Sequence, residues 1–138
     1  MEENKYVKSK AFQGAFQKAG KILRDKDRLS NVLQKTQAKL VNMDGLKAEM
    51  NSFFEKVFTF SRMVKAYISG KYRDIPMRSI LMIIAGLIYF ITPIDFIPDF
   101  IPGIGLIDDV SVILAIFKSL IDDVNRFKLF EQGKEPDQ

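Results

Sequence analysis

The sequence contains no cysteine, no histidine and no tryptophan. The absence of cysteine excludes disulfides, zinc–thiolate sites and thiol nucleophiles. The absence of histidine removes the commonest general base and the commonest ligand of transition metals. No glycine-rich phosphate loop is present, and no serine has a histidine to activate it. These absences leave Asp, Glu, Lys, Tyr or a hard metal ion for chemistry, and the sequence predicts that the protein is not an enzyme.

What is present is a chain of 138 residues, 47% of them hydrophobic, which is typical of one globular domain. Its net charge of +4 is unevenly distributed. Residues 1–78 contain 17 Lys and Arg against 8 Asp and Glu, whereas residues 79–138 contain 4 against 9. A basic first half indicates an anionic partner, a membrane or a nucleic acid, but ordinary solvated helix faces would give the same balance.

Hydrophobic residues recur at helical spacing along the chain, and no stretch alternates as a strand does, so the sequence predicts an all-α fold. The stripe from Phe12 to Leu40 predicts one long basic helix, and further stripes predict helices over about 46–68 and 106–127. The predicted organisation is a basic amphipathic helical arm over 1–45, a helical core over 46–130 and a disordered tail over 131–138.

The segment from Ser79 to Ile94 differs in kind because it carries no charge and is apolar on all sides. A helix without a polar face must be surrounded by protein or by lipid. At about 16 residues it reaches roughly 24 Å, which is shorter than the roughly 30 Å hydrocarbon core of a bilayer. The first residues, from Met1 to Lys5, are polar and acidic, unlike a secretory signal, so we expect the protein on the cytoplasmic side of the membrane.

An unusual loop is predicted between the two last helices, over 92–109, with three prolines, two glycines and four aspartates among large hydrophobes. Carboxylate oxygens suit Mg²⁺ or Ca²⁺, so these aspartates form a candidate metal site. Aspartates at the beginning of a helix also accept backbone N–H bonds, and this capping role is the favoured interpretation. The four residues are Asp95, Asp99, Asp108 and Asp109.

The same segment resembles the hallmark of the bacterial YkvA family, a domain of unknown function, which reads Tyr-x-x-x-Pro-x-Asp-x-x-Pro-Asp-x-x-Pro-x-x-Gly-x-x-Asp-Asp. The resemblance covers about forty residues, and it implies a small helical protein that is associated with a membrane. It implies no reaction and no ligand. The matching residues are Tyr89, Pro93, Asp95, Pro98, Asp99, Pro102, Gly105, Asp108 and Asp109.

The predicted fold is therefore a small helical bundle around a central apolar helical hairpin with a Pro/Asp-rich elbow. The first functional hypothesis is a non-enzymatic interaction or scaffold module at the cytoplasmic side of the inner membrane, with lipids or a membrane protein as partner. In this hypothesis the apolar hairpin lies in or against the membrane or spans it, and the basic arm lies on anionic headgroups. The alternative is a soluble four-helix-bundle binding protein, with a divalent cation at the aspartates and with a protein partner or a second copy of the chain. Nucleic acid is disfavoured because no recognised binding motif accompanies the basic residues.

Titration with Mg²⁺ or Ca²⁺ separates the two interpretations of the aspartates. If they bind metal, the cation should raise the thermal unfolding midpoint, and Asp99→Asn should abolish that gain. If they are caps, each Asp→Ala substitution should lower the free energy of unfolding by about 1 kcal/mol with or without metal. A midpoint that millimolar cation leaves unchanged rules out the metal site.

Overall fold

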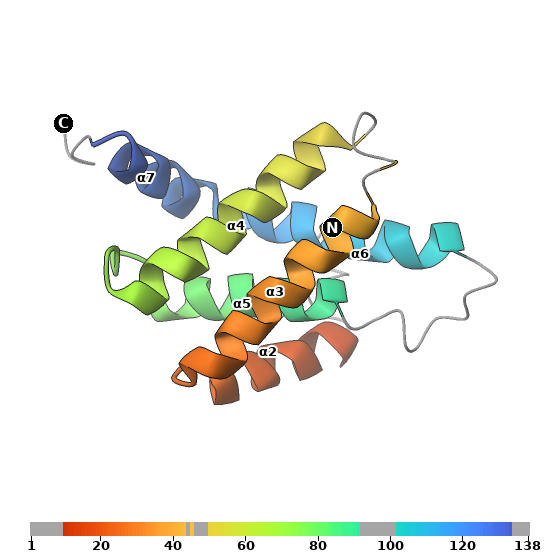
Figure 1. Cartoon of the computed structure of the whole chain (residues 1–138), viewed down its shortest axis with the longest axis horizontal. Helices are drawn as coiled ribbons and strands as arrows, with labels where there is room; N and C mark the ends of the chain where they lie inside the picture. The colour runs from red at the N-terminus through yellow and green to blue at the C-terminus, as the bar shows by residue number, and fades with distance from the viewer. Residues whose placement is uncertain (1–9, 44, 46–49, 92–101, 134–138) are drawn as a thin grey trace.

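The computed structural model describes residues 10–43, 45, 50–91 and 102–133, and within these ranges the chain forms helices and no strand (Figure 1). The predicted all-α helical bundle is confirmed. The helices are α2 (Lys10–Ile22), α3 (Lys26–Asn42), α4 (Asn51–Ser69), α5 (Met77–Ile91), α6 (Pro102–Ser119) and α7 (Ile121–Glu131).

Helix α5 is the centre of the molecule, and helices α2, α3, α4 and α6 all pack against it. Apolar side chains lie on all faces of α5, and Ile80, Ile83 and Leu87 have no exposed surface. Burial of each such side chain is worth about 1.5–3 kcal/mol, so the packing of α5 contributes strongly to stability. Protein therefore covers residues 79–91 of α5, the part of the helix that carries no charge. No helix in the described ranges has the length and the low polarity that crossing a membrane requires.

Helices α5 and α6 form the predicted central pair, and they approach closely at Gly86. A Cβ atom at this position would lie 2.8 Å from Ile116 Cδ1 and 3.5 Å from Ile113 Cδ1. The missing side chain of Gly86 thus creates the space that the two isoleucines of α6 fill. The prediction of a loop over the whole of 92–109 is wrong, because 102–109 belong to α6; the rest of the predicted elbow, 92–101, lies outside the described part of the chain.

The prediction of one long helix over the first third of the chain is wrong, because the structure has two helices there. Asp25 lies between them and accepts a hydrogen bond from Arg28 N–H at 3.1 Å, so it caps the N-terminus of α3. This capping bond is available only if the helix stops before Asp25. The break turns the chain back, so that α2 and α3 both pack on α5, and the predicted arm contributes Phe12, Ala19, Ile22 and Leu29 to the common core.

The prediction of a continuous last helix over 106–127 is also wrong. Helix α6 ends at Ser119, whose hydroxyl donates to Ile116 O at 2.9 Å, and α7 begins at Ile121. The bend at Leu120 directs α7 toward the chain that follows α4, where Phe127 lies 5.3 Å from the Tyr72 ring. Helix α7 extends to Glu131, which forms an ion pair with Arg62 of α4 at 2.7 Å.

Substitution of Gly86 tests the close approach of α5 and α6. Gly86→Leu should lower the free energy of unfolding by at least about 2 kcal/mol, because the added atoms must displace Ile116 and Ile113. The matched control is Gly20→Leu, since Gly20 is exposed on α2 and a Cβ there meets no atom within 4 Å. Urea unfolding followed by circular dichroism should find the control as stable as the wild type or more so. Equal losses at both positions would contradict the packing described.

Candidate basic surface at one end of the bundle

Four of the nine residues singled out by the sequence lie outside the part that the structure describes. Asp95 and Asp99, with Pro93 and Pro98, fall within 92–101. Helix α6 begins earlier than expected, at Pro102, so Asp108 and Asp109 stand in its second turn, beyond the positions that cap a helix N-terminus. Within the described residues, no group of three acidic side chains is placed to hold a metal ion. The metal site and the capping roles of Asp95 and Asp99 therefore remain predictions, whereas the positions of Asp108 and Asp109 within α6 do not fit a capping role.

Three other residues of the sequence pattern are placed by the structure. Pro102 is the first residue of α6, a position at which its missing N–H costs no hydrogen bond. Gly105 follows in the first turn of the same helix. Tyr89 is half-buried near the end of α5, with its ring 6.5 Å from the ring of Phe12. Tyr89 thus joins α2 to α5, which is a structural role.

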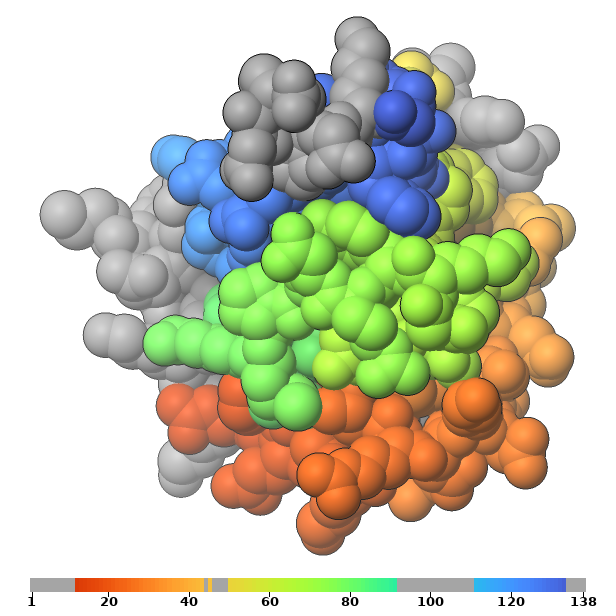
Figure 2. Space-filling view, turned by 90° about the vertical axis from the view of Figure 1, so that its left-hand side faces the viewer, coloured from red at the N-terminus to blue at the C-terminus, as the bar shows by residue number. Residues whose placement is uncertain are grey.

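The turn from α2 into α3 and the turn from α4 into α5 lie at the same end of the bundle (Figures 1 and 2), and many of the basic residues belong to these two segments. We call this surface, formed by residues 21–28 and 65–78, the basic end. It holds eight cationic side chains against three carboxylates, and all eight cations are exposed. Within the described residues, none of the eight forms an ion pair with a carboxylate. They are Lys21, Arg24, Lys26, Arg28, Lys65, Lys71, Arg73 and Arg78.

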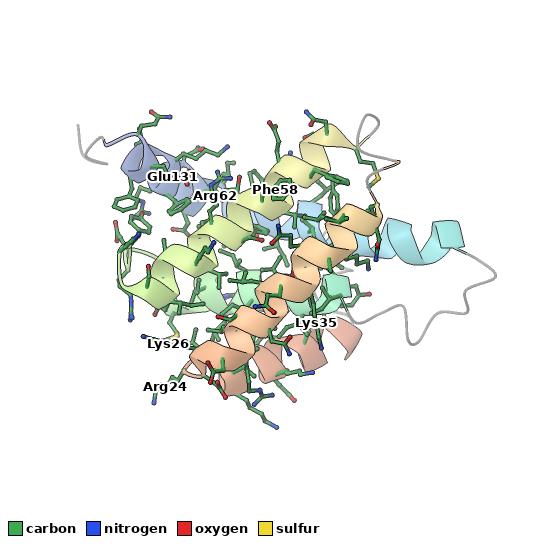
Figure 3. All side chains as sticks on the ribbon, viewed as in Figure 1. Arg24, Lys26, Lys35, Phe58, Arg62 and Glu131 are labelled. Atoms are coloured by element: carbon green, nitrogen blue, oxygen red, sulfur yellow. The ribbon has the colours of Figure 1, made fainter. Side chains whose placement is uncertain are left out.

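Two local features fix the backbone conformation of the basic end. Asp25 caps α3 and so fixes the turn that carries Arg24 and Lys26, which project outward in Figure 3. Gly70 ends α4 in the left-handed conformation, with φ of 80°, and Tyr72 N–H donates to Ala66 O at 3.2 Å. A left-handed residue is easily accommodated only by glycine at such a helix end.

The two segments enclose a hollow of about 390 Å³ on the surface. Arg24 and Lys26 line it from the α2–α3 turn, and Arg73 lines it from the connection before α5. The Arg73 guanidinium lies over the ring of Tyr67, with its carbon 4.7 Å from the ring centroid. Apolar side chains complete the lining, which contains no carboxylate; they are Leu23, Ile68 and the exposed Met77.

A buried polar contact holds the basic end onto α7. The Ser79 hydroxyl, at the start of α5, donates to Asp123 Oδ2 at 2.7 Å, and the other Asp123 oxygen lies 3.6 Å from Arg126 Nη2. Nearby, the Tyr72 hydroxyl is buried without a hydrogen-bond partner among the described residues. Burial raises the pKa of Tyr72 above its ordinary value of 10.0, and the neighbouring Asp74 carboxylate raises it further.

One segment of the chain matches a known family. Residues 79–115, which include most of α5 and most of α6, match the family described as "Protein of unknown function (DUF1232)". The chain is also 28% identical over 74 residues to "Uncharacterized membrane protein YkvA" of Bacillus subtilis, a match that covers 54% of this chain and 70% of the relative. Together these matches confirm the resemblance to the YkvA family. No solved structure matches significantly.

Tyr72→Phe should leave the protein as stable at neutral pH, or more stable by roughly 1 kcal/mol, because the buried hydroxyl that it removes has no partner. The raised pKa of Tyr72 contributes stability that is fully present below pH 10 and is lost as the pH rises from there through the pKa of the folded state. The variant should therefore lose less stability above pH 10 than the wild type. Urea unfolding across the alkaline range measures this, and superimposable profiles would contradict it.

Proposed function

We propose that the protein is a non-enzymatic module that associates with the cytoplasmic surface of the inner membrane by binding anionic lipids at its basic end. The observation that carries this proposal is the accumulation of eight exposed cations against three carboxylates at one end of the bundle. Exposed apolar side chains accompany them: Met77 beside the hollow is 52% exposed, and Phe130 of α7, whose ring lies 4.6 Å from that of Tyr72, is 39% exposed. Cations mixed with exposed large hydrophobes are typical of proteins that bind at the lipid interface.

The enclosure of α5 favours binding at the membrane surface over insertion of the hairpin. Side chains from four helices already cover α5, so lipid contact with it would require these helices to separate. Binding through the basic end requires no such rearrangement. The name of the Bacillus subtilis relative, which calls it a membrane protein, agrees with association of either kind.

The eight cations of the basic end are sufficient in number for reversible attachment to an anionic membrane. A Lys or Arg close to an anionic leaflet contributes about 1 kcal/mol, and this attraction falls off within a Debye length of about 8 Å at physiological salt. Several of the eight cations can approach a flat surface at once, because they come from two adjoining segments of the same end (Figure 2). The resulting attachment should be sensitive to salt.

Vesicle binding of paired charge variants tests the proposal. Lys71→Gln with Arg78→Gln removes two cations from the basic end and should weaken binding to phosphatidylserine-containing vesicles by roughly thirtyfold, from about 1 kcal/mol per charge. The matched control is Lys35→Gln with Lys56→Gln, which removes the same charge from α3 and α4 away from this end, and it should bind nearly as well as the wild type. Cosedimentation over a range of salt concentrations measures the affinities.

Three results would contradict the proposal. If both pairs of substitutions weaken vesicle binding equally, the overall charge of the protein and not the basic end is responsible for the binding. Retention in the membrane pellet through a high-salt wash and then an alkaline carbonate wash would show an embedded hairpin. Failure to bind any anionic vesicle would favour the soluble four-helix-bundle alternative, in which the partner is another protein.

A further inference from the structure

We propose that the hollow at the basic end is a binding site for a phosphate monoester, presented by an anionic lipid headgroup or by a soluble phosphate ester. The lipid source rests on the function proposed above, whereas the chemistry of the site does not depend on it. The hollow has the size of a small-molecule site, for which 300–1,000 Å³ is about the usual range, and its volume of about 390 Å³ exceeds the needs of a single ion.

The charge of the lining favours a dianion. Arg24, Lys26 and Arg73 contribute three positive charges, and the lining contains no carboxylate to neutralise them. A phosphate monoester carries a charge of about −1.5 to −2 at neutral pH, whereas a phosphodiester or a carboxylate carries only one. A monoester therefore matches the excess charge of the hollow best.

The side chains around the hollow also have suitable geometry. Arginine binds phosphate oxygens through two parallel N–H groups, and lysine adds a point charge. The Arg73 guanidinium carbon lies 4.7 Å from the centroid of the Tyr67 ring, and this cation–π contact holds the guanidinium at the lining of the hollow. Lys26 and Met77 are the first residues of α3 and α5. The N-terminus of α3 is already capped by Asp25, whereas the positive dipole end of α5 lies beside the hollow.

Apolar side chains form the part of the hollow that the three cations do not line. Leu23, Ile68 and Met77 offer a carbon surface next to the three cations, which suits the glycerol or acyl portion of an ester. Met77 is 52% exposed, as expected of a residue at the edge between the hollow and a surrounding medium. The hollow thus combines an anion site with an apolar flank.

The decisive measurement is the preference between two lipids at matched total charge. Phosphatidylcholine vesicles that contain phosphatidate, a phosphate monoester, should bind the wild-type protein roughly tenfold more tightly than vesicles that contain phosphatidylserine. Arg24→Gln with Arg73→Gln should abolish this preference. Lys71→Gln with Arg78→Gln removes equal charge outside the hollow, so it should weaken binding to both lipids and leave the preference intact. Arg73→Lys keeps the charge but loses the paired N–H groups, and it should reduce the preference in part.

Calorimetric titration with glycerol 3-phosphate distinguishes the two sources of the phosphate. Binding that Arg24→Gln with Arg73→Gln removes would assign the hollow to soluble esters as well, and it would support the site even if no vesicle binds and the proposed membrane function fails. A phosphatidate preference without binding of glycerol 3-phosphate would assign the site to the lipid alone. Thermal unfolding confirms that each variant is folded, as expected for exposed side chains.

The inference is overturned by any of three outcomes. Equal affinity for the two lipids, together with no binding of glycerol 3-phosphate, would mean that attraction at the basic end is purely electrostatic, with the proposed membrane function intact. A preference that survives Arg24→Gln with Arg73→Gln would place the phosphate elsewhere. If Lys71→Gln with Arg78→Gln also abolishes the preference for phosphatidate, the preference depends on total charge and not on the hollow.

Discussion

The burial of the uncharged run 79–91 of α5 is the constraint on which the rest of this structure depends. Helix α5 has no polar side to turn toward water, so the bundle is stable only if other helices surround it. Helices α2, α3, α4 and α6 do so, and even the carbonyl of Phe90 near the end of α5 accepts a hydrogen bond from Lys39 of α3. The charged residues of the surrounding helices are thereby directed outward.

The same constraint explains why the functional surface lies at an end of the bundle. Helices that cover α5 must run past it and then turn, and the turns between α2 and α3 and between α4 and α5 occur side by side (Figure 1). Both turns are formed by short polar segments, 23–25 and 70–76, that carry several of the cations. A hollow between two turns is open to solvent, whereas the sides of α5 are closed.

Much of this architecture can be predicted from the local sequence pattern. Where it cannot be predicted, the reason is physical. Apolar spacing along 46–68 and the uncharged run after Arg78 are sufficient to predict an all-helical bundle with a buried centre. The breaks at Asp25 and Leu120 could not be predicted because the apolar stripes continue across them, and only tertiary packing decides between a straight helix and a bent one. The hollow is likewise invisible in the sequence: Arg24, Tyr67 and Arg73 are brought together by the packing of α2, α3 and α4 on α5. The excess of Lys and Arg over Asp and Glu in residues 1–78 is the one signal of the basic end that the sequence offers.

The position of α5 within the chain has a consequence for the order in which the protein is made. Helices α2, α3 and α4 precede α5 in the sequence and can receive it as it is synthesised, but α6 follows it. Until the ribosome has produced Ile113 and Ile116, the side of α5 around Gly86 has no cover. Each nascent chain must therefore hold the apolar run of α5 without its α6 partner until the residues up to Ile116 have been made.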